Sequence, residues 1–232
     1  MKKYNSHKLA NALIDDYSNK SIFERIENSK SLHWQRCSAF WEKIISNQMH
    51  IGSNSRTLIK RKTTAEFLIA SDFDKFSNLD NHKKHEVLLK FVPGGRNVSK
   101  ETKVIRLINA VDLILSKGGL NSIFNSNINK EGIIDTLTLI VGIGPKQARN
   151  IPMDLYHPAF RNGSIPIDEN WKRIAKYLGY NWSNSEKHEK DIIEWRNNYI
   201  GRDIIKEDWE LDRLVYFALN DSESNTFKLI KG

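Results

Sequence analysis

The chain has 232 residues, a formal net charge of +8 and an isoelectric point near 9.4. This length can bury a sizeable core in one or two domains, and the basic balance favours a polyanionic partner. The single cysteine, Cys37, excludes a disulfide within the chain and an iron–sulfur cluster held by four cysteines. The seven histidines form no metal-binding pair, so we expect neither a metal nor a cofactor.

The N-terminal segment MKKYNSHKLANALIDDYSNK opens with two lysines, as a secretory signal does, but it lacks an apolar core. No apolar run in the chain approaches the roughly 18 residues that span a bilayer. Together with the single cysteine, these features lead us to expect a cytoplasmic protein that does not contact a membrane.

Helical patterns begin in this segment. The spacing of apolar residues predicts short helices over 7–17 and 20–28. The next predicted helix has an apolar face made by Leu32, Trp34, Ala39, Phe40, Ile44 and Ile45. Residues 56–62 (RTLIKRK) form a basic cluster, which we interpret as a solvated helix face able to touch a phosphate backbone.

A long helix is predicted in the middle of the chain. It follows an irregular loop, FVPGGRNVSK, which contains a proline and a glycine pair. Ser99 suits the N-cap of a helix that continues through LINAVDLILS, and Gly118-Gly119 suits its end.

The segment 131–171 is the most informative part of the chain. Its first apolar stretch has helical spacing and runs into Gly142-Ile143-Gly144-Pro145, where a second helical pattern starts. Gly142 suits the left-handed position that ends a helix, and Pro145 suits the first turn of the next, where its missing N–H costs nothing. The pattern therefore predicts two helices joined by a tight hairpin. Free N–H groups at the start of the second helix suit a phosphate of DNA or RNA.

Lys146 follows directly, in the first turn of the second helix. The helix macrodipole disfavours a cation there, which favours a neutral amine that can act as a nucleophile. The alternative is a solvated lysine that touches a phosphate. GIGPKQAR is not a dinucleotide-binding loop, because it lacks a third glycine and follows a helical pattern, and it is not a P-loop, because no GK[ST] closes it.

LIVGIGPKQARNI, followed by SIPIDENWKRIAKYLG, resembles the signature of the helix-hairpin-helix (HhH-GPD) DNA glycosylases. That signature is a Gly-apolar-Gly hairpin, a lysine just after it and a later apolar-Asp-helix segment. In the family the lysine attacks the sugar and the aspartate assists, so the resemblance implies catalytic roles for Lys146 and Asp168. Asp168 follows Lys146 by 22 positions (168 − 146), slightly more than is expected for the family. Asp168 also suits the N-cap of the next helix.

The resemblance extends to DNA contacts. The segment IISNQ resembles the family's helix end at which a glutamine enters the duplex beside the extruded base, and this residue is Gln48. A solvated glutamine near a helix end is the alternative. The DNA contacts implied for the hairpin are those of Gly142, Ile143, Gly144, Lys146 and Gln147.

Three further helical patterns follow Asp168, and no segment alternates as a strand does. The predicted class is therefore all-α. The resemblance implies a monomer of two helical domains that binds double-stranded DNA, with the active site in the cleft between them. Residues 31–154 form the central domain, which ends in the hairpin, and residues 1–30 and 155–232 together form the second.

The implied function is a DNA glycosylase that flips out and excises a damaged or modified base. Cleavage builds positive charge on the sugar ring, which the carboxylate of Asp168 would stabilise. Attack by Lys146 would leave a Schiff base that can break the strand by β-elimination (AP lyase activity), whereas attack by water would leave an intact abasic site. Most tryptophans should be core residues; by family analogy, Trp209 or Phe217 is a candidate for stacking on the flipped base.

No short motif encodes the base. An oxidised purine such as 8-oxoguanine is favoured, because a lysine and an aspartate without an iron–sulfur cluster resemble the 8-oxoguanine DNA glycosylase/AP lyase branch. One alternative is a hypermodified pyrimidine, such as a glucosylated cytosine of phage DNA, which would make the protein a defence enzyme. Two others are a non-catalytic hairpin protein that clamps phosphates and a nuclease or structure-specific binder. Neither of these explains the position of Asp168.

Overall fold

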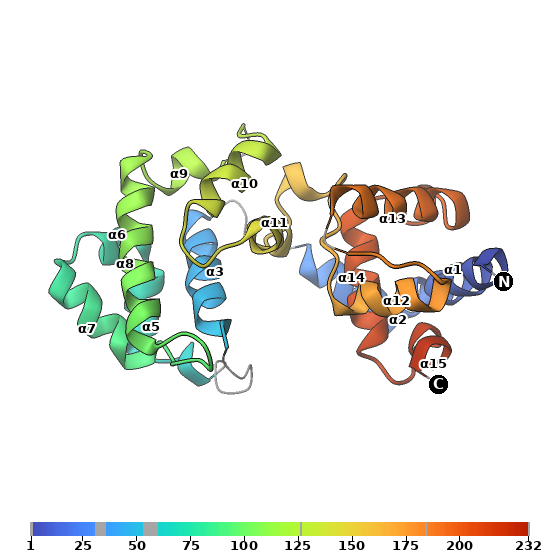
Figure 1. The fold of residues 1–232 in the computed structure, drawn as a ribbon, viewed down its shortest axis with the longest axis horizontal. Helices are drawn as coiled ribbons and strands as arrows, with labels where there is room; N and C mark the ends of the chain where they lie inside the picture. The colour runs from blue at the N-terminus through green and yellow to red at the C-terminus, as the bar shows by residue number, and fades with distance from the viewer. Residues whose placement is uncertain (1, 31–35, 53–59, 126, 184, 232) are drawn as a thin grey trace. The chain divides into compact units, whose positions relative to one another are not determined.

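The computed structural model describes residues 2–30, 36–52, 60–125, 127–183 and 185–231 (Figure 1). Within these ranges every regular element is a helix and no strand occurs, which confirms the predicted all-α class. Contacts divide the chain into two compact units. Unit 1 comprises Met1–Ser31 and Tyr156–Gly232, and unit 2 comprises Leu32–Leu155.

Unit 2 is a helical unit whose long helix α8 (Lys100–Ser116) packs against neighbours from both sides of it in the sequence. Its helices besides α8 include, in chain order, α3 (Cys37–His50), α5 (Ala65–Ser71), α6 (Phe73–Ser77), α7 (Asn81–Phe91), α9 (Leu120–Ile123), α10 (Lys130–Thr138) and α11 (Pro145–Asp154). Helix α3 contacts α5, α8, α9 and α11, so it forms the centre of the unit. Its face of Phe40, Ile44 and Ile45 is completely buried, as the apolar spacing predicts.

The predicted ends of α8 are confirmed. The Ser99 hydroxyl accepts a hydrogen bond from the backbone N–H of Thr102 at 3.0 Å, which satisfies one of the donors left over in the first turn. At the other end, Gly118 has φ +89 and its N–H donates to the Leu115 carbonyl at 3.0 Å. These two local signals set the length of the helix, which packs against α3.

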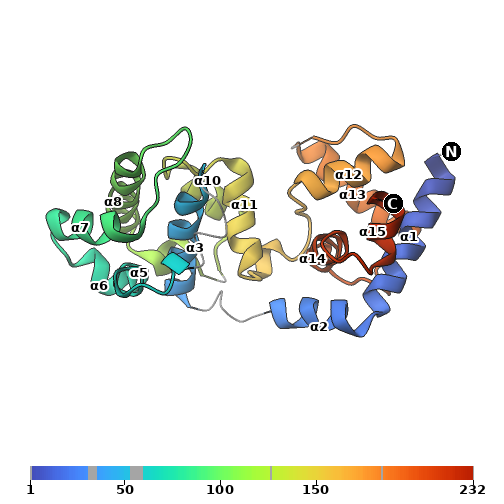
Figure 2. The ribbon, with the colours of Figure 1, turned by 90° about the horizontal axis from the view of Figure 1, so that it is seen from below.

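Unit 1 joins the two ends of the chain (Figures 1 and 2). Its elements are α1 (Lys2–Ser18), α2 (Lys20–Ser29), the 3₁₀ helix η2 (Pro158–Phe160), α12 (Glu169–Leu178), α13 (Glu186–Tyr199), α14 (Asp208–Leu219) and α15 (Asn225–Lys231). Helix α1 contacts α2 and all four later α-helices. The carboxylate of Asp16 in α1 accepts the N–H groups of Asn225 and Thr226 at the start of α15, at 2.8 and 2.9 Å. The N-terminal segment is therefore an integral part of this unit.

Some predicted features need correction or lie outside the described residues. Helix α1 begins at Lys2, earlier than the predicted start at residue 7, because polar residues continue the helix before the apolar spacing becomes regular. Leu32, Trp34 and residues 56–59 of the basic cluster lie outside the described residues. The other five tryptophans are at most 4 % exposed, as predicted for core residues.

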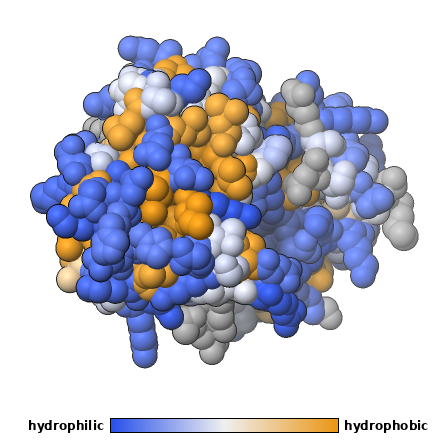
Figure 3. All heavy atoms as spheres, turned by 60° about the vertical axis from the view of Figure 1, so that its left-hand side comes forward, coloured by the Kyte–Doolittle hydropathy of each residue, from blue (hydrophilic) through white to orange (hydrophobic). Residues whose placement is uncertain are grey.

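The surface carries no sign of a bilayer span: among the described residues, no helix combines the required length and hydropathy. Figure 3 nevertheless shows a patch of apolar side chains among hydrophilic ones on the face turned toward the viewer. Large exposed apolar residues of unit 2 include Leu68 and Ile69 of α5 and Ile105 and Leu115 of α8.

Candidate functional site

The connection between α10 and α11 is a tight turn, as the sequence predicts. Gly142 has φ +91, which only glycine adopts without strain, and Pro145 is the first residue of α11. One detail differs from the prediction. Helix α10 stops at Thr138 with Leu139 as its C-cap, so Gly142 reverses the chain inside the connection and does not end the helix. The Ile143 N–H donates to the Ile140 carbonyl at 2.9 Å, which closes the turn, and the Ile143 side chain is 3 % exposed, so it anchors the turn to the core.

The side chain of Gln48, in α3, contacts this turn and stabilises it. Its side chain is completely buried, and Nε2 donates a hydrogen bond to the Val141 carbonyl at 2.9 Å. A Cβ added to Gly142 would lie 2.9 Å from Gln48 Nε2 and 3.1 Å from Arg106 Nη1, distances that real Cβ atoms do not tolerate without a shift of their neighbours. Glycine at position 142 is therefore required by its backbone conformation, and a larger residue would also have to displace the ends of two side chains.

The interpretation of Gln48 as a solvated residue is wrong, because the side chain has no exposed surface. Burial and the bond to Val141 give it a structural role in the hairpin. Its insertion into a DNA duplex stays a prediction, and it would require the side chain to give up this bond.

Lys146 is the second residue of α11, and no side chain caps that end of the helix. The first helical hydrogen bond runs from the Ala148 N–H to the Gly144 carbonyl at 2.9 Å, so the N–H groups of Lys146 and Gln147 precede the bonded ladder. The Lys146 side chain is half-buried, and its ammonium group forms no hydrogen bond or ion pair with a described residue. A lysine beside unused helix N–H groups is an arrangement that suits an anion from outside the chain.

Two basic residues of α8, which the sequence pattern did not single out, lie close to the hairpin or to the end of α3 that contacts it. Arg106 approaches Gly142, as the 3.1 Å distance shows. Lys103 is completely buried and donates to the Met49 carbonyl at 3.3 Å. Burial lowers the pKa of Lys103, and the positive charge of Arg106 lowers it further. These residues precede the hairpin by more than 30 positions, so only the packing of α8 against α3 brings them there.

Asp168 is the N-cap of α12, as predicted. A single oxygen, Oδ1, accepts the N–H groups of Asn170 at 2.8 Å and Trp171 at 3.0 Å. The other oxygen, Oδ2, forms no hydrogen bond or ion pair with a described residue. The preceding segment, Ser164 to Ile167, is completely or almost completely buried, so the carboxylate is held at the end of a fixed stretch of chain.

A small cavity of about 30 Å³ lies beside Asp168 and is also lined by Asp212, Arg213 and Tyr216 of α14. Asp212 Oδ1 accepts the indole N–H of Trp171 at 2.9 Å, and its Oδ2 accepts from Arg213 Nη2 at 2.7 Å. The second carboxylate is therefore neutralised by a neighbouring arginine. Tyr216 is 47 % exposed and is the accessible aromatic residue of this cavity.

Trp209, which family analogy offered as a base-stacking residue, is a core residue. It is 1 % exposed, and its ring centroid lies 4.7 Å from that of Tyr156. Phe217 is half-buried beneath the guanidinium of Arg25, whose Cζ lies 4.4 Å from its ring centroid. Neither ring faces the cavity at Asp168.

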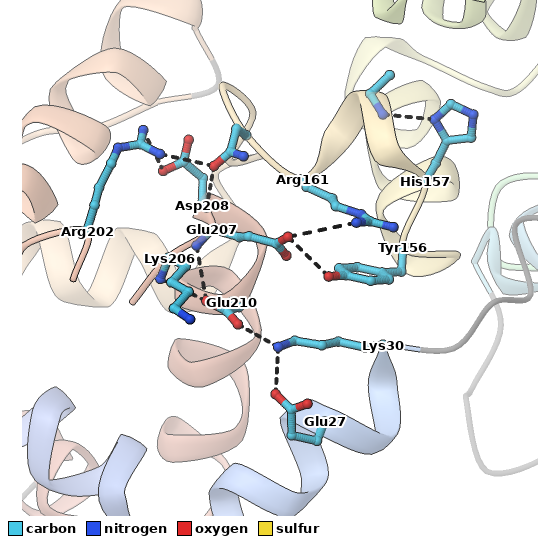
Figure 4. A network of polar contacts seen from close by, with 12 residues as sticks. Glu27, Lys30, Tyr156, His157, Arg161, Arg202, Lys206, Glu207, Asp208 and Glu210 are labelled. Atoms are coloured by element: carbon cyan, nitrogen blue, oxygen red, sulfur yellow. Dashed lines mark hydrogen bonds and ion pairs between the residues drawn. The ribbon is translucent and has the colours of Figure 1, made fainter. Parts of the chain in front are cut away.

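A polar network holds the chain that leads to Asp168 (Figure 4). The Tyr156 hydroxyl donates to Glu207 Oε1 at 3.1 Å, and the guanidinium carbon of Arg161 lies 3.9 Å from the Tyr156 ring centroid. The N–H of Gly163 donates to Asp208 Oδ2 at 2.7 Å. Buried Arg196 forms an ion pair with Asp208. Segment 156–163 therefore makes several polar contacts with residues at the N-terminus of α14.

Burial shifts the acids of this network toward their protonated forms. It raises the pKa of Tyr156 to about 12, with help from the hydrogen bond to Glu207. It also raises the pKa of Glu207 above its ordinary value. Lys30 behaves differently: burial disfavours its charge, but hydrogen bonds to Glu210 and Glu27, both at 2.6 Å, raise its pKa. Tyr156 also has φ +57, which is unusual for a bulky residue.

The predicted site residues therefore lie in different units. Lys146 and the hairpin belong to unit 2, and Asp168 belongs to unit 1. Their meeting in one cleft stays a prediction. Among the described residues, no group of three or more metal-ligating side chains is placed to hold an ion.

Comparison of the chain with protein-family models, curated proteins and solved structures gives no match. The resemblance to the helix-hairpin-helix glycosylases thus rests on the motif residues themselves.

Proposed function

We propose that the protein is a DNA glycosylase that extrudes and excises a modified base, with an oxidised purine such as 8-oxoguanine as the favoured substrate. The observation that supports this most is the start of α11, where Lys146 stands without a partner among the described residues at a helix end that no side chain caps. A structural helix N-terminus is normally closed by a capping side chain and an acidic first turn.

DNA binding by the hairpin follows from general electrostatics. A DNA phosphate is attracted by the N–H groups of Lys146 and Gln147 and by the positive end of the helix. Arg106 adds a cation close to Gly142, and the chain as a whole carries a net charge of +8. These charges would draw the duplex to the hairpin and make binding strongly dependent on salt.

Asp168 and Lys146 have different roles in the proposed reaction. Loss of the base leaves positive charge on the sugar ring, and the unused Oδ2 of Asp168 is available to stabilise that charge. Lys146 Nζ would use its lone pair to form a bond to C1′ of the sugar while the C1′–N bond breaks and its electron pair leaves with the base. The sugar ring would then open at its C1′–O bond, and the ring oxygen would take up a proton released by the lysine nitrogen. The resulting Schiff base permits β-elimination on the 3′ side. Asp168 keeps its capping bonds throughout, because these use Oδ1.

Attack by water is the alternative route. The cavity beside Asp168 has about the volume of one water molecule, roughly 30 Å³, and two carboxylates line it. A hydrolytic enzyme would leave an intact abasic site, and Lys146 would then serve only as a phosphate ligand.

Trapping with borohydride separates the two routes. On the Schiff-base route, borohydride links the wild-type protein to its substrate duplex, and Lys146→Gln loses the adduct while duplex binding persists. Lys100→Gln is the matched control, because Lys100 is also a half-buried lysine in the first turn of a helix of unit 2. Trapping that survives Lys146→Gln would contradict the assignment of the nucleophile.

The base is tested with a panel of duplexes that carry 8-oxoguanine, alkylated purines, uracil or glucosylated hydroxymethylcytosine. Release of 8-oxoguanine under multiple turnover is the expected result. Release of the glucosylated cytosine with 8-oxoguanine untouched would instead assign a role in attack on foreign DNA. Salt-dependent duplex binding without release of any base would favour a non-catalytic hairpin protein, for which the uncapped start of α11 would be a phosphate clamp alone.

A further inference from the structure

A second cavity lies in unit 1, between α13 and the connection that precedes it. Its volume is about 440 Å³, within the usual range of roughly 300–1,000 Å³ for small-molecule sites. None of its lining residues borders the cavity at Asp168. The catalytic proposal therefore leaves this cavity unexplained.

Four aromatic side chains line the cavity in two stacked pairs. The rings of Tyr180 and Trp182, from the α12–α13 connection, have centroids 5.0 Å apart and an interplanar angle of 7°. The rings of Trp195 and Tyr199, from α13, have centroids 6.0 Å apart and an angle of 30°. Tyr180 is 40 % exposed, so part of this wall is open to solvent. Such walls suit a flat ligand or a cation.

Two acids decide between these ligands. Asp191 and Glu194 also line the cavity, and their spacing of three positions puts them on one face of α13. Neither forms a hydrogen bond or an ion pair with a described residue. Lys187 is the one basic residue among those that line the cavity, so the lining carries a net charge of −1.

We propose that this cavity binds an organic cation, an ammonium or guanidinium group. Aromatic faces attract a cation through the ring quadrupole, and a carboxylate at the rim adds a direct ion pair. A nucleic-acid strand fits the site less well, because Asp191 and Glu194 would repel its phosphates. The group can come from a free polyamine or from a basic side chain of a protein segment. The proposal is independent of the glycosylase assignment.

Because the chain has a positive net charge, nonspecific binding of small cations should interfere little with the test. A protein of net charge +8 does not attract small cations in general, so saturable binding reports a local site. The full-length protein is titrated by calorimetry with spermidine, with tetramethylammonium and with a short arginine-rich peptide. Saturable binding of at least one of them is expected, and it should weaken as salt is added. Absence of saturable binding up to about 10 mM for all three would overturn the proposal.

Variants locate the site. Asp191→Asn with Glu194→Gln should weaken binding about tenfold or more, and Tyr180→Ala should weaken it with both carboxylates intact. The control is Glu24→Gln with Glu223→Gln, which removes two exposed charges of unit 1 that do not line the cavity. Equal affinity in the control and the double variant would overturn the proposal, as would equally tight binding of a neutral sugar that neither variant affects.

The two sources of the cation are separated by the same titrations. Tighter binding of spermidine than of the peptide assigns a free polyamine. Tighter binding of the peptide assigns a basic protein segment. In each case, Asp191→Asn with Glu194→Gln should weaken binding of the ligand that the wild type binds more tightly.

Discussion

Helices α11 and α12 both begin with backbone N–H groups that the helix itself does not bond, but the side chains beside those groups carry opposite charges. At α12 the carboxylate of Asp168 accepts two backbone N–H groups, so the helix end is satisfied within the chain. At α11 no side chain caps the end, and a lysine occupies the first turn. The first arrangement stabilises a helix and leaves one carboxylate oxygen without a hydrogen bond, whereas the second leaves the first N–H groups of the helix without a side-chain acceptor. Helix capping accounts for the position of Asp168 by itself, whereas the lysine at the start of α11 is the feature that the proposed DNA contact would explain.

The largest effect is expected at Asp168. Asp168→Asn keeps the capping acceptor but removes the charge, so base release should fall by about 100-fold or more while thermal stability changes little. Single-turnover excision and calorimetric melting measure the two quantities. Asp80→Asn is the matched control, because Asp80 caps α7 by accepting the Lys83 N–H at 2.8 Å. Near-normal excision by Asp168→Asn would show that Asp168 acts only as the N-cap of α12.

Gly142→Ala tests the hairpin itself. It adds strain at φ +91, on the order of 1–2 kcal/mol, and an overpacking cost of about 1–3 kcal/mol against Gln48 and Arg106. Gly163→Ala is the control, because Gly163 has φ +71 and nothing within 4 Å of an added Cβ. Urea unfolding should show the larger loss for Gly142→Ala. Equal losses would mean that the close contacts relax freely.

Gln48→Met separates the two roles of Gln48. It removes the bond to the Val141 carbonyl at nearly constant volume, so stability should fall by about 1 kcal/mol and duplex affinity should fall with it. Denaturant unfolding and fluorescence anisotropy measure the pair. Unchanged stability with a large loss of excision would instead favour insertion of Gln48 into the duplex.

Arg106→Gln tests the cation close to the hairpin. If Arg106 neutralises a phosphate, the slope of log affinity against log salt should become shallower by about 1, with little change in stability. Lys117→Gln, at the far end of the same helix, is the control. An unchanged slope would mean that Arg106 does not contact the DNA backbone.

The smallest effect concerns the network that leads to Asp168. Burial raises the pKa of Glu207, so its contribution to stability is fully present below the unfolded value of 4.5 and is lost as pH rises through the folded value. Glu207→Gln keeps an acceptor for the Tyr156 hydroxyl and should flatten the fall in stability above pH 4.5. Melting temperatures from pH 4.5 to 8 measure this, with Glu24→Gln as the exposed control. Parallel curves for Glu207→Gln and the wild type would contradict the assignment.

Features that depend on a few consecutive residues were predictable from the sequence. The all-α class, the Ser99 cap, the positive φ of Gly142, the place of Pro145 and the Asp168 cap are of this kind. Each follows from the hydrogen-bonding or conformational needs of a helix end, which involve backbone groups within about four positions. A single chain therefore carries these signals without comparison to any other.

The tertiary structure decided which distant side chains surround those helix ends. Gln48 meets Val141 across 93 positions, and Trp171 meets Asp212 across 41. Arg106 reaches the hairpin and Tyr216 reaches the cavity of Asp168 only because their helices pack where they do. The solvated interpretation of Gln48 and the choice of Trp209 failed for this reason. Helical spacing tells which residues share a face, but burial depends on what packs against that face, and that is set by contacts that a local pattern does not encode.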